Sequence, residues 1–381
     1  MVNRNSDYSG SRHRRRHGKA FTVFVALVSF VLVLCAYAGK ISPEVFLPAP
    51  FLNLAYLPML FVALFALLAA FALRRWLSAV LLVLAFLLTL PVFMLNVPLN
   101  GEDGAPPAPA DPKMQFTVMT YNVLSFNYNE PGYGEKPSAT MRLILDANPD
   151  VVLIQEGCPN GVVWSEIPSI QPYLVEIEAK YPYRYDGLEG LNIMSKYPFT
   201  TTALGEPQHV RTALGFNRNQ KAYLARAFDL QLPSGKQLRL IDFRLQSYHL
   251  SFGKNMNVHI SPDVKPAPLE RMRRSFILRD GNATDIRQSI DASPANVIVC
   301  GDMNDVPASH VYSIIRGEDM KDAWGEVGRG YAPTFNRHHL PFRIDHVLYR
   351  GDLQALNAQR IKGGDSDHYP IMVTFDIDIN N

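Results

Sequence analysis

Residues 297–305 read V-I-V-C-G-D-M-N-D, and this stretch gives the clearest indication of the fold. Four apolar residues run without interruption into Gly301, Asp302 and Asn304. A short apolar run that ends at glycine predicts a β-strand, and the lack of polar alternation predicts a sheet covered on both faces. Asp302 and Asn304 would then lie just past the strand end, where they could cap a turn or face a ligand.

The same arrangement, an apolar strand that ends in a polar residue, recurs along the C-terminal part of the chain. The polar residues concerned are Asn122, Glu156, Asp345, Asp367 and His368. Taken singly, each has an ordinary structural explanation, since Asp345 could be a satisfied buried carboxylate and a lone histidine is more often structural than catalytic. Because so many occupy equivalent positions, we interpret them as one site.

Strands and helices are mixed along this part of the chain, which predicts a layered α/β fold. Ser138 is expected to cap a helix that ends at Asn148-Pro149. Strands are expected at 116–123, 151–155, 190–195, 222–230, 238–246, 297–300, 344–349 and 371–375, and helices at 138–147, 166–180, 267–289 and 307–316.

The residue types in the predicted site suit phosphodiester hydrolysis, which requires neutralised phosphate charge and an activated water. Glu156, Asn122 and Asp367 offer the carboxylate and amide oxygens that Mg²⁺ prefers. His368 can exchange protons with phosphoryl oxygens, and Asp345 could fix its tautomer. Cysteine and histidine spacing typical of a zinc site does not occur in the sequence.

Five short motifs, in this order, resemble the signature of the endonuclease/exonuclease/phosphatase superfamily. They are T-Y-N-V at 120–123, I-Q-E at 154–156, C-G-D-M-N-D at 300–305, R-I-D-H at 343–346 and S-D-H-Y-P at 366–370. The resemblance covers roughly residues 115–377. That family includes DNase I-like nucleases, abasic-site endonucleases, sphingomyelinases and inositol polyphosphate phosphatases, and its fold is a four-layer α/β/β/α sandwich.

By position, the resemblance implies a role for each candidate residue. Glu156 resembles the metal carboxylate and Asn122 the amide of the metal site. Asp302 and Asn304 resemble the pair that handles water and phosphate. The final group of two acids and a histidine corresponds to Asp345, Asp367 and His368.

One position departs from the family pattern. A second histidine is often found in a motif like H-L-Q-S, but residues 244–247 read R-L-Q-S. Either Arg244 replaces this histidine as a phosphate contact or His249 takes the role. Strand alternation puts the two on opposite faces, so only one can face the site without a bulge, and we favour Arg244. The pair His338-His339 is expected in an exposed loop.

The N-terminal part of the chain predicts a membrane anchor. Three apolar stretches, 21–39, 51–73 and 77–97, approach the length of about 20 residues that a spanning helix needs. Residues 1–20 are rich in arginine, and Arg74 and Arg75 lie between the second and third stretches. By the positive-inside rule both segments are cytoplasmic, so three crossings place everything after Val97 outside the cytoplasm. A nucleic-acid role is the rival interpretation of the arginine-rich tail.

Composition supports this division into a tail (1–20), three membrane helices (21–97), a linker (98–113) and a catalytic domain (114–381). The linker reads P-L-N-G-E-D-G-A-P-P-A-P-A-D-P-K. Beyond residue 113 we count 27 Lys and Arg against 30 Asp and Glu, so the domain as a whole lacks a basic footprint. The three cysteines, Cys35, Cys158 and Cys300, are expected to be small buried residues.

The sequence therefore predicts a membrane-anchored hydrolase of phosphoester bonds that uses Mg²⁺, with Mn²⁺ as an alternative. Its catalytic domain would be extracytoplasmic, which is the periplasm in a bacterium. Two substrate classes compete: nucleic acid on one side, and a phospholipid or small phosphorylated metabolite on the other. A third possibility is a phosphate-binding module without catalysis, because of Arg244. Partners are expected to be the phosphoester and the lipid bilayer, and the sequence indicates no protein partner.

Overall fold

The computed structural model describes residues 6–100, 115–128, 136–157, 162–187, 190–204, 224–232, 235–247, 268–336 and 341–377. The chain divides into two compact units, an N-terminal helical unit that ends at Met94 and a larger α/β unit that begins at Leu95. His249, His338, His339 and Cys158 lie outside the described residues, and Cys35 and Cys300 are buried free thiols.

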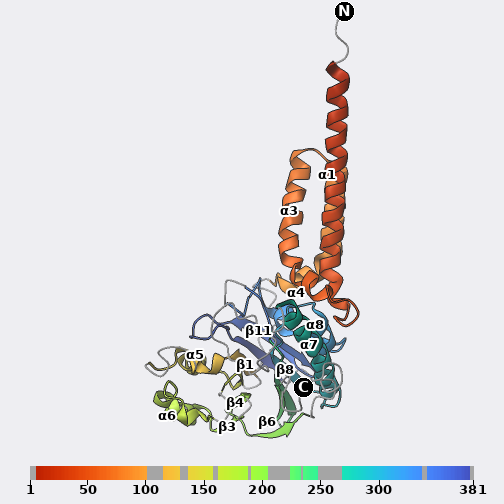
Figure 1. The fold of residues 1–381 in the computed structure, drawn as a ribbon. Helices are drawn as coiled ribbons and strands as arrows, with labels where there is room; N and C mark the ends of the chain where they lie inside the picture. The colour runs from red at the N-terminus through yellow and green to blue at the C-terminus, as the bar shows by residue number, and fades with distance from the viewer. Residues whose placement is uncertain are drawn as a thin grey trace, which may run out of the picture. The chain divides into compact units, whose positions relative to one another are not determined.

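The α/β unit contains two mixed sheets of six strands each (Figure 1). The first has the order β11-β12-β1-β2-β4-β3, and its one parallel pair is β1 with β2. Its strands are β1 (Gln115–Asn122), β2 (Val151–Gln155), β3 (Tyr183–Asp186), β4 (Asn192–Ser195), β11 (Gln354–Arg360) and β12 (Ile371–Asp376).

The second sheet has the order β5-β6-β7-β8-β10-β9, and its one parallel pair is β7 with β8. Its strands are β5 (Phe199–Ala203), β6 (Leu224–Gln231), β7 (Gln237–Arg244), β8 (Val297–Asp302), β9 (Lys321–Asp322) and β10 (Asp345–Arg350). Strands β3, β5, β9 and β11 were not predicted, because each is short or carries several polar residues.

Alternation along the strands separates three apolar clusters. Phe116 and Val118 of β1 pack against residues of the second sheet such as Leu240 and Ile298, so the two sheets face each other. Met119, whose side chain lies on the opposite face of β1, joins a cluster with the helices outside the first sheet. A third cluster packs helices onto the outer face of the second sheet. The predicted order of layers, α/β/β/α, follows from these contacts.

The helices that cover the sheets are α5 (Ala139–Ala147), α6 (Leu174–Lys180), α7 (Pro268–Asp291), α8 (His310–Arg316) and α9 (Ala323–Val327). Ser138 caps α5 as predicted, since its Oγ accepts a hydrogen bond from the Met141 N–H at 3.2 Å. Asn148 ends α5 in the left-handed conformation, with φ of 48°. The helical region expected over 166–180, with interruptions at Pro168 and Pro172, forms as separate short helices. One-turn 3-10 helices lie at Trp164–Glu166 and Gln171–Tyr173, and α6 begins at Leu174.

The first residues of the expected linker are bound to the α/β unit. Asn100 donates its side-chain amide to the carbonyl of Gly328 at 2.6 Å, and the Gly330 N–H donates to the Pro98 carbonyl at 2.8 Å. The Leu95 carbonyl, just upstream, accepts a hydrogen bond of 2.7 Å from the buried guanidinium of Arg343. Residues 101–113 of the linker lie outside the described part of the chain.

The helical unit contains α1 (Ser6–Tyr37), the 3-10 turn Ala38–Lys40, α2 (Ala49–Leu54), α3 (Tyr56–Ala72) and α4 (Trp76–Asn96). Among the described residues, two helical segments, Lys19–Lys40 and Trp76–Asn96, are long and apolar enough to cross a membrane. The expectation of a third helix of this length over 51–73 is wrong. Pro58 lacks the N–H that would bond to Leu54, and the helix is broken between Leu54 and Tyr56.

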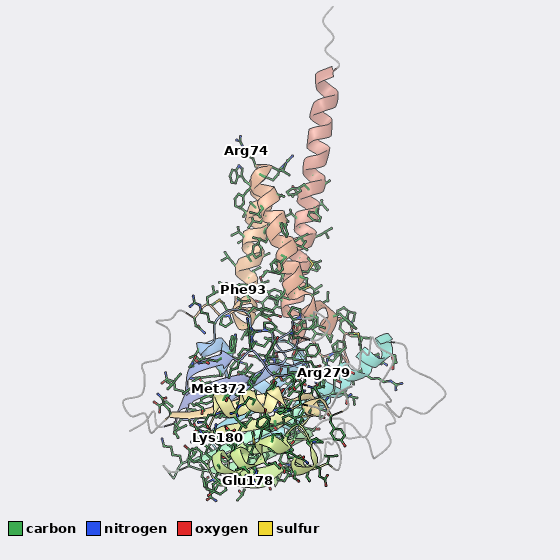
Figure 2. The ribbon with its side chains drawn as sticks, turned by 90° about the vertical axis from the view of Figure 1, so that its left-hand side faces the viewer. Arg74, Phe93, Glu178, Lys180, Arg279 and Met372 are labelled. Atoms are coloured by element: carbon green, nitrogen blue, oxygen red, sulfur yellow. The ribbon has the colours of Figure 1, made fainter. Side chains whose placement is uncertain are left out.

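Packing within the helical unit places small residues inside and large apolar ones outside. Ala63, Ala66 and Ala85 lie in the buried contact between helices. The side chains of Phe30 and Phe65 are 65% and 70% exposed. Arg74 lies at the turn between α3 and α4 (Figure 2). Small residues at helix contacts with large apolar residues facing outward are typical of helices in lipid.

The N-cap of α5 gives a direct test of the local folding argument. Ser138→Ala should lower the free energy of unfolding of the α/β unit by about 1 kcal/mol, because the Met141 N–H loses its acceptor in a buried position. Thermal unfolding measures the change. Ser165→Ala, at an exposed serine, is the matched control and should leave the unfolding temperature within error. Equal effects of the two substitutions would show that the cap does not stabilise the helix.

Candidate active site

The site forms where the two parallel strand pairs end. Asn122 ends β1 and Glu156 directly follows β2, in the first sheet. Arg244 ends β7 and lies opposite Asp302, which ends β8, in the second sheet. Parallel strands carry their carboxyl ends to the same edge of a sheet, so four polar side chains far apart in sequence meet there.

Asn122 connects the two sheets. Its buried side-chain amide donates to Glu156 Oε1 at 3.0 Å and to Asp302 Oδ2 at 3.1 Å, so one group bridges carboxylates of both sheets. Its oxygen accepts from the Leu124 N–H at 3.2 Å. The expected role of Asn122 as an oxygen ligand for metal would require the amide to turn by 180°.

Asp302 and Asn304 form a tight turn after β8. Asn304 donates its backbone N–H to Asp302 Oδ1 at 2.8 Å and its side-chain amide to Asp302 Oδ2 at 2.9 Å. Asn304 has φ of 50° and Glu156 has φ of 51°, a left-handed conformation that non-glycine residues adopt at some cost. Burial raises the pKa of Asp302 to about 6, against the opposing effect of the nearby His368 charge. The Asp302 carboxylate is therefore mostly ionised at pH 7.

Asp345 and His368 form the predicted pair. His368 Nδ1 lies 2.9 Å from Asp345 Oδ2, and both side chains are buried. Burial alone would lower the pKa of His368, but the Asp345 carboxylate offsets this and raises it to about 10. The loop that carries His368 is fixed by Ser366, whose Oγ donates to the Asn122 carbonyl at 2.7 Å and accepts from the His368 N–H at 3.1 Å.

Arg244, the residue that we favoured at the position of the family's second histidine, contacts a candidate metal ligand. Its Nη2 lies 2.6 Å from Glu156 Oε1. Burial alone would raise the pKa of Glu156, but Arg244 and the Asn122 amide together hold it below its usual range. His249, the alternative at this position, lies outside the described residues.

The charges and donor atoms fit a hard divalent cation. The side chains of Glu156, Asp302, Asp345 and Asp367 bring four carboxylates to the site, against the two cations Arg244 and His368. One ligand atom from each of Asp302, Asp345 and His368 lies within 4.8 Å of the other two. Asp367 is half-buried, and its charge contributes to the raised pKa of His368. A divalent cation would offset the excess negative charge.

Two sets of polar residues near the site were not among the predicted site residues. Gln155 of β2 donates to Asp242 Oδ1 of β7 at 2.5 Å, and both side chains are fully buried between the sheets. Burial raises the pKa of Asp242 well above its usual range. Asp365 forms a second group, because its Oδ1 accepts from the Thr140 N–H at the start of α5. For Gln155 and Asp242 the sequence did offer a signal, since each is a polar residue inside an apolar strand, in I-Q-E at 154–156 and L-I-D-F at 240–243.

Asp345→Asn should lower the pKa of His368 by several units, since burial then acts on the ring without the opposing carboxylate. In the unmodified protein His368 should keep its proton up to about pH 10, whereas in the variant it should be neutral at pH 8. Imidazole NMR across this range measures the shift. His346, whose pKa burial lowers to about 4, is an internal control and should stay neutral throughout. An unchanged His368 titration would show that Asp345 does not hold the proton.

Comparison with known proteins gives one match to a family model. The model of the Endonuclease/Exonuclease/phosphatase family matches residues 119–368, which include all nine candidate residues, eight of them in the described structure. A search among curated proteins finds no match.

A search among solved structures finds several that are similar to this chain at low sequence identity. A Danio rerio TDP2 humanised by 14 mutations is 18% identical, with 69% of this chain and 99% of that chain covered and a TM-score of 0.48. The human Nocturnin catalytic domain is also 18% identical, with 70% and 99% covered and a TM-score of 0.45. A mannosyl-6-phosphatase from Bacteroides thetaiotaomicron is 13% identical, with 68% and 99% covered and a TM-score of 0.41.

The family match spans most of the α/β unit, from β1 to the histidine of the S-D-H motif. The match begins within β1, whose last residue is Asn122, and ends at His368. The matched region therefore contains the residues that form the candidate site. The chain belongs to the endonuclease/exonuclease/phosphatase family, whose members are hydrolases that act on phosphoester bonds.

Proposed function

We propose that the α/β unit is a divalent-metal-dependent phosphoesterase. The proposal rests on the arrangement of the charged side chains at the strand ends. A buried Asp345–His368 pair lies close to Asp302, and the amide of Asn122 bonds both Asp302 and Glu156. Such a site can bind a phosphoryl group between cations and still hold a carboxylate for an attacking water.

The pKa shifts assign the proton-transfer roles. His368, with a pKa raised to about 10, is cationic at neutral pH and cannot act as a base there. It donates a hydrogen bond to a phosphoryl oxygen and neutralises charge that develops on it. Asp302, with a pKa raised to about 6, is ionised at pH 7 and is therefore the one of the two groups that is free to accept a proton at that pH. Asp302 orients and deprotonates the water, and Asn304 contacts the phosphate.

Glu156 and Asp367, with Asn122 after rotation of its amide, would hold the metal. When bound, Mg²⁺ or Mn²⁺ supplies charge neutralisation of the phosphate. Arg244 provides a guanidinium whose planar fork matches a phosphate oxygen pair. Its ion pair with Glu156 keeps it at the edge of the site in the absence of metal and substrate.

Two substrate classes remain, and a direct assay separates them. The near-neutral charge of the region after residue 113 argues weakly against tight duplex binding, and an apolar helical unit argues weakly for a substrate near a membrane. The assay tests hydrolysis of DNA, RNA, phospholipid and sugar phosphate in the presence of Mg²⁺. Bis(p-nitrophenyl) phosphate and p-nitrophenyl phosphate serve as a generic diester and monoester. Hydrolysis of none of these, by protein that binds Mg²⁺, would support a phosphate-binding module without catalysis.

Glu156→Gln keeps the shape of the side chain and removes one charge from the proposed metal site. We expect Mg²⁺ affinity to fall about tenfold to a hundredfold and activity to fall with it, with little change in unfolding temperature. Calorimetric Mg²⁺ titration measures the affinity. Glu178→Gln, at an exposed carboxylate on α6 (Figure 2), is the matched control and should change neither quantity. Unchanged Mg²⁺ binding in Glu156→Gln would remove this residue from the metal site.

We further propose that α1, α3 and α4 lie in a bilayer. Their large apolar side chains are exposed, and this would cost free energy in water. Helix α3 has 17 residues and rises about 26 Å, close to the hydrocarbon thickness of about 30 Å, so thinning of the bilayer could accommodate it. The basic pair Arg74-Arg75 then lies on the cytoplasmic side and the α/β unit on the other.

Reporter fusions decide between three crossings and two. With three, a reporter fused after Arg75 should be active only inside the cytoplasm, and one fused after Val97 only outside. If only α1 and α4 cross, both results reverse. A topology-independent reporter, such as an epitope tag read after lysis, controls for expression of each fusion.

A further inference from the structure

Helix α7 buries a charged side chain that the proposed reaction does not use. Its inward face contains the apolar residues Phe276, Ala283, Ile286 and Ile290, spaced as one helical stripe. Arg279 lies on the same stripe and is completely buried (Figure 2). A buried guanidinium costs free energy unless its surroundings bind it well, so its contacts indicate what it does.

Arg279 contacts both loops that leave the second sheet at the site. Its Nη1 donates to the Gln246 carbonyl at 3.0 Å, and its Nη2 lies 3.6 Å from Asp305 Oδ2. Gln246 is two residues past Arg244, and Asp305 directly follows Asn304. One side chain on α7 therefore spans the segments that carry a phosphate-binding cation and a phosphate-binding amide.

Other bonds tie the same two loops together. Asn304 donates its side-chain amide to the Leu245 carbonyl at 2.9 Å, so the loops also contact each other directly. Ser275, one turn before Arg279, donates to the Ser247 carbonyl at 3.0 Å. On the other side, His346 Nε2 lies 3.0 Å from the Asp305 carbonyl. Arg279 thus belongs to a buried polar layer directly behind the site.

We propose that Arg279 is a positioning residue that holds Arg244 and Asn304 at a fixed separation for phosphate binding. The paired part of β7 and β8 ends at Arg244 and Asp302, and one more backbone bond follows it, from the Leu245 N–H to the Asp302 carbonyl at 2.9 Å. Past this bond, the side chains of Asn304 and Arg279 connect the two loops. Asn304 adopts the left-handed conformation, with φ of 50°, that turns the chain back toward Asp302. The planar fork of arginine suits two acceptors in fixed directions, and lysine cannot reproduce it. The inference rests on the proposed phosphoesterase activity.

If Arg279 had a purely structural role, a different result would be expected. A double substitution distinguishes a structural role from a positioning role. Arg279→Met leaves the Asp305 carboxylate buried without its cation, so it should lower stability whatever the role of Arg279. Adding Asp305→Asn removes that carboxylate charge and should restore most of the unfolding temperature. If Arg279 positions the loops, the double variant should still be defective, because the Gln246 carbonyl has lost its donor.

The experiment uses the full-length protein in detergent, with bis(p-nitrophenyl) phosphate and p-nitrophenyl phosphate as substrates and inorganic phosphate as a binding probe. In the double variant we expect kcat to fall about tenfold to a hundredfold and phosphate to bind more weakly, at a near-normal unfolding temperature. Arg279→Lys, which keeps the charge beside Asp305, should show the same defect in kcat.

Arg287→Met is the matched control on the same helix. Arg287 binds Asp291, Asp319 and the Ile315 carbonyl, away from the site loops, so its loss should lower stability and leave kcat and phosphate affinity unchanged. Recovery of normal kcat and phosphate affinity in the double variant would overturn the positioning role while leaving the phosphoesterase proposal intact. Inactivity and lack of phosphate binding in the unmodified protein would reject the proposed function, and this inference with it.

Discussion

The amide of Asn122 donates to carboxylates that belong to different sheets, and the geometry of the site depends on this contact. Glu156 is fixed by the first sheet and Asp302 by the second, so their separation is set by how the sheets pack. That packing is provided by a continuous apolar layer between them, which includes Val118, Leu240 and Ile298. A close-packed interior transmits small displacements, so a change in this layer would move the two halves of the site apart.

Polar contacts between the sheets add directional constraints to this apolar layer. The buried pair of Gln155 and Asp242 joins β2 to β7 next to the Arg244–Glu156 ion pair, because Gln155 directly precedes Glu156 and Asp242 lies two residues before Arg244. Sliding of the sheets would remove the Gln155 donor from the buried Asp242 carboxylate, which is costly, whereas Gln155 would keep its bond to Thr120 in its own sheet. The apolar core holds the sheets together, and the buried polar pairs define how they are aligned.

The electrostatics of the site follow from the different partners of similar groups. Asp302 and Asp345 are both buried carboxylates, but Asp345 has His368 as a direct partner, whereas Asp302 is bonded to the neutral amides of Asn122 and Asn304. The pair stores a proton on His368 up to about pH 10, and Asp302 loses its proton near pH 6. Neutral pH lies between these values, which separates the proton donor from the proton acceptor. The helical unit follows a different rule, because its large apolar side chains face outward and small ones pack inside.

The sequence by itself determined the strands that end in polar residues, the cap of α5 and the residue types of the site, because periodicity, capping and turn chemistry are local properties. Strand alternation also indicated that Arg244 and His249 lie on opposite faces, but not which of the two faces the site. Pairing of short polar strands such as β3 and β5 was not visible, since their neighbours in the sheet supply their stability. Pro58 was a local signal for the break in the second apolar stretch, and apolar length alone concealed it. The sequence could not show that Asn122 would turn its amide nitrogen toward two carboxylates, or that Arg279 would reach two loops from α7. Those two outcomes depend on groups brought together from distant parts of the chain, and only the tertiary structure decides them.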